Sequence, residues 1–187
     1  LEVQELSSSM KGLAPLFFFA TSIVLWAQNV ENLWKSNSPD GSYVAATRRI
    51  PDKEFIWRDD LDGFRLVVFP LQPDSDHTPG KLYFSQDFPG RFPAQIQWSP
   101  DSQFIALTTT SSGGHSPWHY TAYVLSIAQR RVASPDETIG AVVAPEFTFK
   151  APHTVILGIG KSTAEGIDFE HPVKTDVTLP TLFSGKK

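Results

Sequence analysis

The segment from Ser111 to Tyr120, Ser-Ser-Gly-Gly-His-Ser-Pro-Trp-His-Tyr, holds the most distinctive polar side chains of the chain. Its His115 and His119 are of a type that often binds metal ions. No third ligand lies nearby in the sequence, and a Gly-Gly-Ser-Pro segment is not the helix that would align two imidazoles four residues apart. Trp118 and Tyr120 are rigid aromatic residues of the kind that anchor binding surfaces. We therefore expect a partner-binding loop of His115, Trp118, His119 and Tyr120, with an exposed loop that only covers the core edge as the alternative.

The acidic run from Asp59 to Gly63 is a second, weaker candidate, because it imitates part of a calcium-binding loop. The first ligand position of such a loop would be Arg58, and the twelfth would be Phe69 instead of Glu. These departures favour a solvated acidic turn that could serve as a contact loop through Asp59, Asp60 and Asp62. Weak cation binding by Asp60 and Asp62 is the alternative.

The remaining patterns do not predict catalysis. Gly158-Ile-Gly-Lys-Ser162 imitates the end of a phosphate-binding loop, but the required first glycine falls at Val155, so we expect a turn at the end of a strand. The sequence contains no Gly-x-Ser-x-Gly elbow and no His-Glu-x-x-His motif. It also contains no cysteine, which excludes thiolate zinc sites and a cysteine nucleophile. We expect a protein that is not an enzyme and that holds no metal or cofactor.

The elements that must position these residues are short strands. From Val30 onward, apolar runs of strand length alternate with Gly, Pro, Asp and Ser, and no stretch keeps a helical period. Only residues 30–35 and those around Thr138 are predicted to form a helical turn. The expected strands are 43–47, 64–71, 81–85, 94–98, 104–110, 122–127, 142–149 and 155–159.

An internal repeat organises these strands. The ten residues from Ser38 to Thr47 align with those from Ser99 to Thr108, and seven positions match in identity or type. Each copy begins with Ser-Pro-Asp, which favours a tight turn, and continues into an aromatic and β-branched strand. The segment from Ala151 to Leu157 is a degenerate third copy. A further Ser-Pro-Asp at residues 134–136 is predicted to be a loop between strands, because its next residues are less strand-like.

The repeat resembles the Pro-Asp-type repeats of β-propellers, such as the periplasmic propeller of the Tol system and its WD-repeat-like relatives. The stretch from Gln97 to Ala106, followed by Tyr123–Ile127, a turn and Arg131-Val132, looks like one blade of four antiparallel strands. The copies begin 61 and 52 residues apart, whereas a usual blade has roughly 40 to 45 residues. Three blades are also fewer than the roughly four to eight of a closed ring.

The expected fold class is therefore all-β, with antiparallel blade-like sheets in an incomplete or small propeller-like assembly. A β-sandwich is the alternative. An open set of blades leaves unpaired sheet edges, which must be covered or paired with another chain. Completion of these edges by a homo-oligomer is one way to satisfy them.

The N-terminal residues predict export. Met10-Lys11 precedes an uncharged apolar stretch that ends at the small residue Ala27, as in a secretory signal peptide. Residues 1–27 are then upstream residues plus the signal, and residues 28–187 form a single β-rich domain that begins at Gln28. An uncleaved membrane anchor is the alternative, although the uncharged run only just reaches spanning length and contains Pro15. After cleavage no stable membrane span is expected.

Charge and the resemblance complete the functional expectation. The chain has 16 Lys and Arg residues against 20 Asp and Glu, a net charge of -4, which disfavours a nucleic-acid partner. We expect a non-catalytic binding module in the bacterial periplasm or outside the cell, whose partner is a protein or another envelope component. The resemblance also implies an alternative, the propeller portion or accessory fragment of a larger secreted hydrolase or peptidase.

Overall fold

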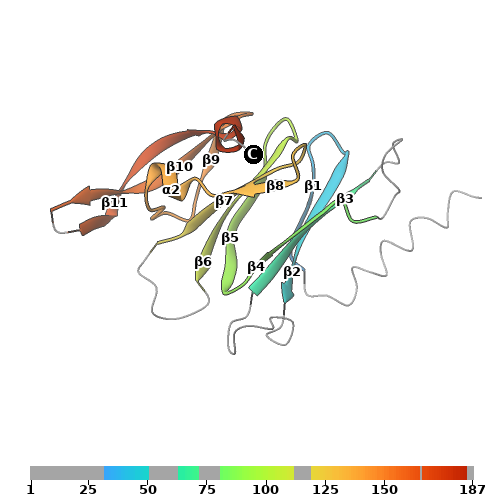
Figure 1. Ribbon diagram of the computed structural model, residues 1–187, viewed down its shortest axis with the longest axis horizontal. Coiled ribbons are helices and arrows are strands. Elements are labelled where there is room, and N and C mark those ends of the chain that lie inside the picture. Colours follow the sequence, from blue (N-terminus) through green and yellow to red (C-terminus); the bar gives the residue numbers. More distant parts are fainter. Residues whose placement is uncertain (1–31, 51–62, 72–80, 112–118, 165, 185–187) are drawn as a thin grey trace, which may run out of the picture. The chain divides into compact units, whose positions relative to one another are not determined.

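The computed structural model describes residues 32–50, 63–71, 81–111, 119–164 and 166–184, and Figure 1 shows their arrangement. Within these ranges the chain is all-β and forms three antiparallel sheets. The only helical elements described there are α2 (Asp136–Ile139) and the 3-10 helix η2 (Leu179–Phe183). The described strands close into no barrel.

Each sheet is an up-and-down meander in which strands adjacent in the chain are hydrogen-bonded neighbours. Sheet 1 contains β1 (Asn32–Asn37), β2 (Tyr43–Ile50), β3 (Gly63–Pro70) and β4 (Phe84–Phe88). Sheet 2 contains β5 (Arg91–Trp98), β6 (Phe104–Ser111), β7 (Thr121–Ser126) and β8 (Arg131–Ala133). Sheet 3 contains β9 (Thr148–Ala151), β10 (Thr154–Thr163) and β11 (Gly166–Thr178). The expected antiparallel, blade-like organisation is therefore confirmed.

Sheet 2 is buried on both faces because it lies between the other two (Figure 1). Along β6, Ile105 and Leu107 belong to the core that is shared with sheet 1. Phe104 and Ala106 point to the opposite face and belong to the core that is shared with sheet 3. This follows from the two-residue period of a strand, and it explains why the residues of β6 from Phe104 to Thr109 are all buried.

The first Ser-Pro-Asp turn joins β1 to β2 through its own side chains. The Ser38 hydroxyl donates to Asp40 Oδ1 at 2.6 Å, and the Tyr43 amide donates to Ser38 Oγ at 2.9 Å. Gly41 has a φ of +72°, in the left-handed region that glycine adopts without strain. The turn is thus closed by the residue types that the sequence repeats.

The second turn, between β5 and β6, has the same geometry. The Ser99 hydroxyl donates to Asp101 Oδ1 at 2.7 Å, and the Phe104 amide donates to Ser99 Oγ at 2.9 Å. Ser102, in the place of the glycine, has a φ of +64°. The hairpin turns that the repeat predicts are therefore confirmed in both copies.

Successive turns also contact one another. The Asp40 amide donates to Ser102 Oγ at 3.0 Å, and Asp101 Oδ2 lies 2.6 Å from Nε2 of His153, in the β9–β10 turn. Burial acts to raise the pKa of Asp101, but hydrogen bonds with Ser99, the Gln103 amide and His153 outweigh it and hold the pKa below its ordinary value. The degenerate third copy therefore forms a hairpin in line with the other two.

Two predicted elements near the ends of sheets are wrong. Residues 32–37 form strand β1 instead of a helical turn, because pairing with β2 satisfies their backbone and Trp34 packs against the core shared by sheets 1 and 2. The strand expected at 81–85 lies at 84–88. The helical turn expected around Thr138 is confirmed as α2.

The C-terminal third departs most from the prediction. Of the strand expected at 142–149, only the part from Thr148 is in β9, and Val142 makes isolated bridges to Tyr120 and Ile159. Pro145 interrupts this segment, since proline has no amide to donate to a ladder. Strand β11 was not predicted at all.

Residues 158–162 lie inside β10, where a turn was expected. Their glycines serve close packing: a Cβ on Gly160 would come within 2.8 Å of Val143 Cγ1, and one on Gly158 within 2.8 Å of Ala144 Cβ. The segment containing Val143 and Ala144 therefore crosses β10 at a separation that only glycine permits.

Candidate functional site

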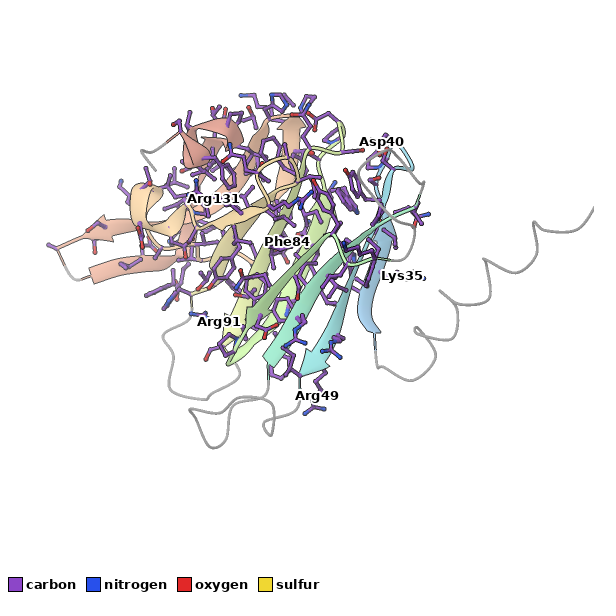
Figure 2. All side chains as sticks on the ribbon, turned by 45° about the vertical axis from the view of Figure 1, so that its right-hand side comes forward. Lys35, Asp40, Arg49, Phe84, Arg91 and Arg131 are labelled. Atoms are coloured by element: carbon purple, nitrogen blue, oxygen red, sulfur yellow. The ribbon has the colours of Figure 1, made fainter. Side chains whose placement is uncertain are left out.

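A hollow of about 460 Å³ lies where the outer strands of sheets 1 and 2 meet. Its walls come from β4, from the turn between β4 and β5, from the first residue of β5, and from β7 and β8. The lining residues are Gln86, Asp87, Phe88, Pro89, Arg91, Tyr123 and Val132. Figure 2 shows Arg91 at the end of the sheets opposite to Asp40, so the hollow is remote from the hairpin turn that contains Asp40.

Arg91 is the first residue of β5 and is placed by a tight turn in which Gly90 has a φ of +65°. Its side chain is half-buried, and within the described part of the chain its guanidinium makes no hydrogen bond or ion pair. The other cation near the hollow is engaged: Arg65 forms a bidentate pair with Asp87, with Nη2 2.8 Å from Oδ2. Arg91 is thus the positive group that remains available to a ligand.

The wall beside Arg91 is aromatic. The rings of Phe88 and Tyr123 meet edge to face with their centroids 4.9 Å apart. Burial raises the pKa of the Tyr123 phenol, while the nearby Arg91 acts to lower it and Asp136 acts to raise it. Because the phenol stays protonated near neutral pH, it offers a hydrogen-bond donor next to an apolar surface.

Asp136 is the first residue of α2, and its carboxylate accepts the backbone N–H of Ala122 at 3.1 Å. Burial raises the pKa of Asp136 to about 6, and this effect exceeds the opposing effects of the Ala122 amide, His119 and Arg91. The charge beside Arg91 therefore changes with pH around a value of about 6.

This arrangement is suited to binding. A guanidinium without a partner pairs well with a carboxylate, in up to two parallel hydrogen bonds. The half-buried Tyr123 ring, which packs against the buried Phe88, offers apolar contact beside it, as in sites that hold an aromatic or aliphatic anchor. Within the described residues no group of three or more His, Cys, Asp or Glu side chains is arranged to hold a metal ion.

The residues expected from the sequence are only partly described. His115, Trp118 and the acidic candidates Asp59, Asp60 and Asp62 lie outside the described residues. His119 lies near the Asp136 carboxylate, whose pKa it acts to lower. Tyr120 makes a bridge to Val142 and packs on the core shared by sheets 2 and 3.

Sequence reasoning did not identify Arg91, Tyr123 or Asp136. One signal was present: the Ser-Pro-Asp at 134–136 recurs without a strand after it, which sets its aspartate apart from those of the two hairpin turns. Nothing in the sequence marks Arg91 and Tyr123 as neighbours, because they lie on β5 and β7, which are brought near each other only by pairing with β6 in sheet 2.

Comparisons with protein-family models, with curated proteins and with solved structures each found no match to this chain. In the ranges that the structure describes, no helix is long and apolar enough to cross a membrane.

Proposed function

We propose that this chain is an exported, non-catalytic protein-binding module built on propeller-like blades, and that it binds through the hollow at Arg91. The ligand is an extended segment of a partner protein that places a carboxylate on the Arg91 guanidinium and an apolar side chain on the ring of Tyr123. The observation that carries this proposal is the half-buried Arg91, which has no hydrogen-bond partner in the described residues and lines an open hollow.

Electrostatics support a carboxylate as the group that is bound. Asp87 also lines the hollow, but its charge is balanced by Arg65. Burial raises the pKa of Asp136 to about 6, so below that pH this side chain is mostly neutral and leaves the charge of Arg91 to a ligand. At neutral pH Asp136 is mostly ionised and partly offsets Arg91, so a ligand carboxylate should bind more tightly at mildly acidic pH.

The other polar pairs support binding over catalysis. Nε2 of His153 lies 2.6 Å from Oδ2 of Asp101 and holds two hairpin turns together. Nδ1 of His171 lies 3.1 Å from Oδ2 of Asp168 and holds an irregular stretch of backbone. Among the described residues, neither imidazole has a hydroxyl hydrogen-bonded to its second nitrogen, as a nucleophile activated by histidine would require. Export and a partner in the envelope are part of the proposal and rest on the apolar N-terminal stretch and the modest net charge.

Selection from a phage-displayed library of random peptides tests the proposal. We expect enrichment of peptides with an acidic residue next to an apolar one. A synthetic peptide of the selected sequence should bind the Arg91→Gln variant about 10-fold to 100-fold more weakly, because a hydrogen bond between charged groups contributes about 1.5 to 3 kcal/mol.

Arg131→Gln is the matched control, because Arg131 is an exposed arginine on the neighbouring strand β8 (Figure 2). The control variant should bind like the wild type, and a peptide whose acidic residue is replaced by its amide should bind wild type and Arg91→Gln equally. Selected peptides that bind Arg91→Gln with unchanged affinity would refute the hollow as the binding site.

A further inference from the structure

Among the described strands, sheet 3 has no counterpart of the fourth strand that completes the other two sheets. In sheet 1, β4 pairs with residues 64–68 of β3, and in sheet 2, β8 pairs with residues 124–126 of β7. β11 has the corresponding third place in sheet 3, but no described strand pairs with its outer edge. The chain instead enters η2, whose Leu179 and Phe183 are buried in the core.

The open edge carries apolar surface. Val173 is 49% exposed and Ile167 is 43% exposed, and both lie on β11. Long, unprotected edge strands tend to pair with other chains. Sheet 3 therefore has both an unfilled strand position and an apolar surface beside it.

The sequence Val173-Lys-Thr-Asp-Val177 is self-complementary when it pairs antiparallel with itself about Thr175. In that register Lys174 lies opposite Asp176 of the second copy, and Asp176 lies opposite its Lys174. On the opposite face of the strand, Val173 of one copy lies opposite Val177 of the second copy. The two Thr175 residues lie opposite each other. Opposite charges, β-branched pairs and Thr–Thr pairs are favourable directly across antiparallel strands.

We propose that two copies of this chain associate through their β11 strands, antiparallel and centred on Thr175, so that each copy supplies the missing fourth strand of the other's sheet 3. The pairing covers the exposed Val173 and places an opposite charge beside Lys174, which forms no ion pair within the described residues. Asp176 Oδ2 lies 2.6 Å from Nζ of Lys150 in the same copy. In the dimer Asp176 therefore lies between this lysine and Lys174 of the second copy.

The rest of β11 limits this association to a dimer. Asp168 Oδ1 accepts the amides of Glu170 and His171, which fixes an irregular stretch where the β10–β11 register shifts. Pro172, the next residue, has no amide to donate. Bulges and prolines both protect a strand edge from pairing, so only residues 173–178 remain available to another chain. One two-fold contact with a second copy occupies these residues, so no third copy can pair with the same edge.

Charge reversal tests the register. Lys174→Asp alone or Asp176→Lys alone places like charges opposite each other, so each variant should self-associate at least about tenfold more weakly than wild type in sedimentation equilibrium. An equimolar mixture of the two variants restores both opposite-charge pairs and should associate like wild type. Lys150→Ser is the matched control: it breaks the contact with Asp176 away from the edge and should not change self-association.

The absence of native cysteine permits a second test. Thr175→Cys should form a disulfide-linked dimer under mild oxidation, because the register places the two residues directly opposite. Ser85→Cys, on the exposed edge strand β4, is the control for random collision and should crosslink much more slowly. A wild-type chain that stays monomeric to millimolar concentration, a mixture that does not recover association, or equal crosslinking of both cysteine variants would overturn the proposal, and none of these results bears on the Arg91 hollow.

Discussion

Replacing Asp136 by Asn should stabilise the protein at neutral pH. Asn has nearly the same shape as Asp, and its side-chain oxygen can still accept the Ala122 amide, which lies 3.1 Å from the carboxylate. The substitution removes only the charge. Since burial is the largest influence on this carboxyl, the charge is the unfavourable part of the interaction.

The size and the pH range of the effect follow from the pKa. Asp136 has a pKa of about 6 in the folded protein against an ordinary value of 3.8, so the folded state keeps a proton that the unfolded chain has lost in this range. The wild type therefore loses stability as the pH rises from about 4 to about 6. The full difference corresponds to about 3 kcal/mol, and solvent screening of this partly exposed group reduces it to about 1 to 2 kcal/mol.

Urea unfolding followed by tryptophan fluorescence at pH 4, 5, 6 and 7 measures this effect. The free energy of unfolding of Asp136→Asn should match that of wild type at pH 4 and exceed it by about 1 to 2 kcal/mol at pH 7. Glu137→Gln, a substitution at the exposed neighbour on α2, should show no such pH-dependent difference. If Asp136→Asn were instead less stable than wild type at pH 7, attraction between Asp136 and Arg91 would outweigh burial, and the reasoning would be wrong.

Three further substitutions or measurements test the fold and the export signal. Trp98→Ala should lower the free energy of unfolding by about 3 to 5 kcal/mol, because Trp98 is 5% exposed between sheets 1 and 2, whereas Trp98→Phe should cost clearly less. Gly160→Ala should destabilise by about 1 to 3 kcal/mol in the same assay, since its Cβ would press on Val143 and the Asp168 carbonyl, and a variant as stable as wild type would contradict this close crossing. Expressed in a Gram-negative host, the mature protein should begin at Gln28 by intact-mass measurement, and retention of Met10 in a membrane-bound product would favour an anchor instead.

The hairpins could be predicted because their signals are local. Ser, Pro, Asp and a small residue at fixed positions determine a turn through their own backbone preferences and hydrogen bonds. The aromatic or β-branched residues that follow then determine a strand with a period of two. For this reason the strand after Pro39 and the strands on both sides of Pro100 could be predicted, and Trp98 was recognisable as a core residue, whereas β1, before Pro39, was expected to be a helical turn.

β11 could not be predicted in this way, because it is an edge strand. Its residues are mostly exposed, so selection for a buried face does not impose an alternating apolar pattern on them. Charged residues and Pro172 interrupt the strand signal, and these are the residues that protect an edge. The Arg91 hollow was missed for another reason: it joins side chains from two sheets, and no local pattern encodes how sheets stack.

The three Ser-Pro-Asp sequences show why a motif alone does not determine the chemistry of its aspartate. Asp40 and Asp101 are partly desolvated, but each accepts a hydrogen bond from the serine two residues earlier and from a nearby amide, so the pKa of each is lowered. At 134–136 the next residues start a helix instead of a strand, and the carboxylate turns to the Ala122 amide of the neighbouring strand. Burial then dominates and the pKa rises to about 6. The residues after the tripeptide decide whether its carboxylate closes a turn or faces Arg91 beside the hollow.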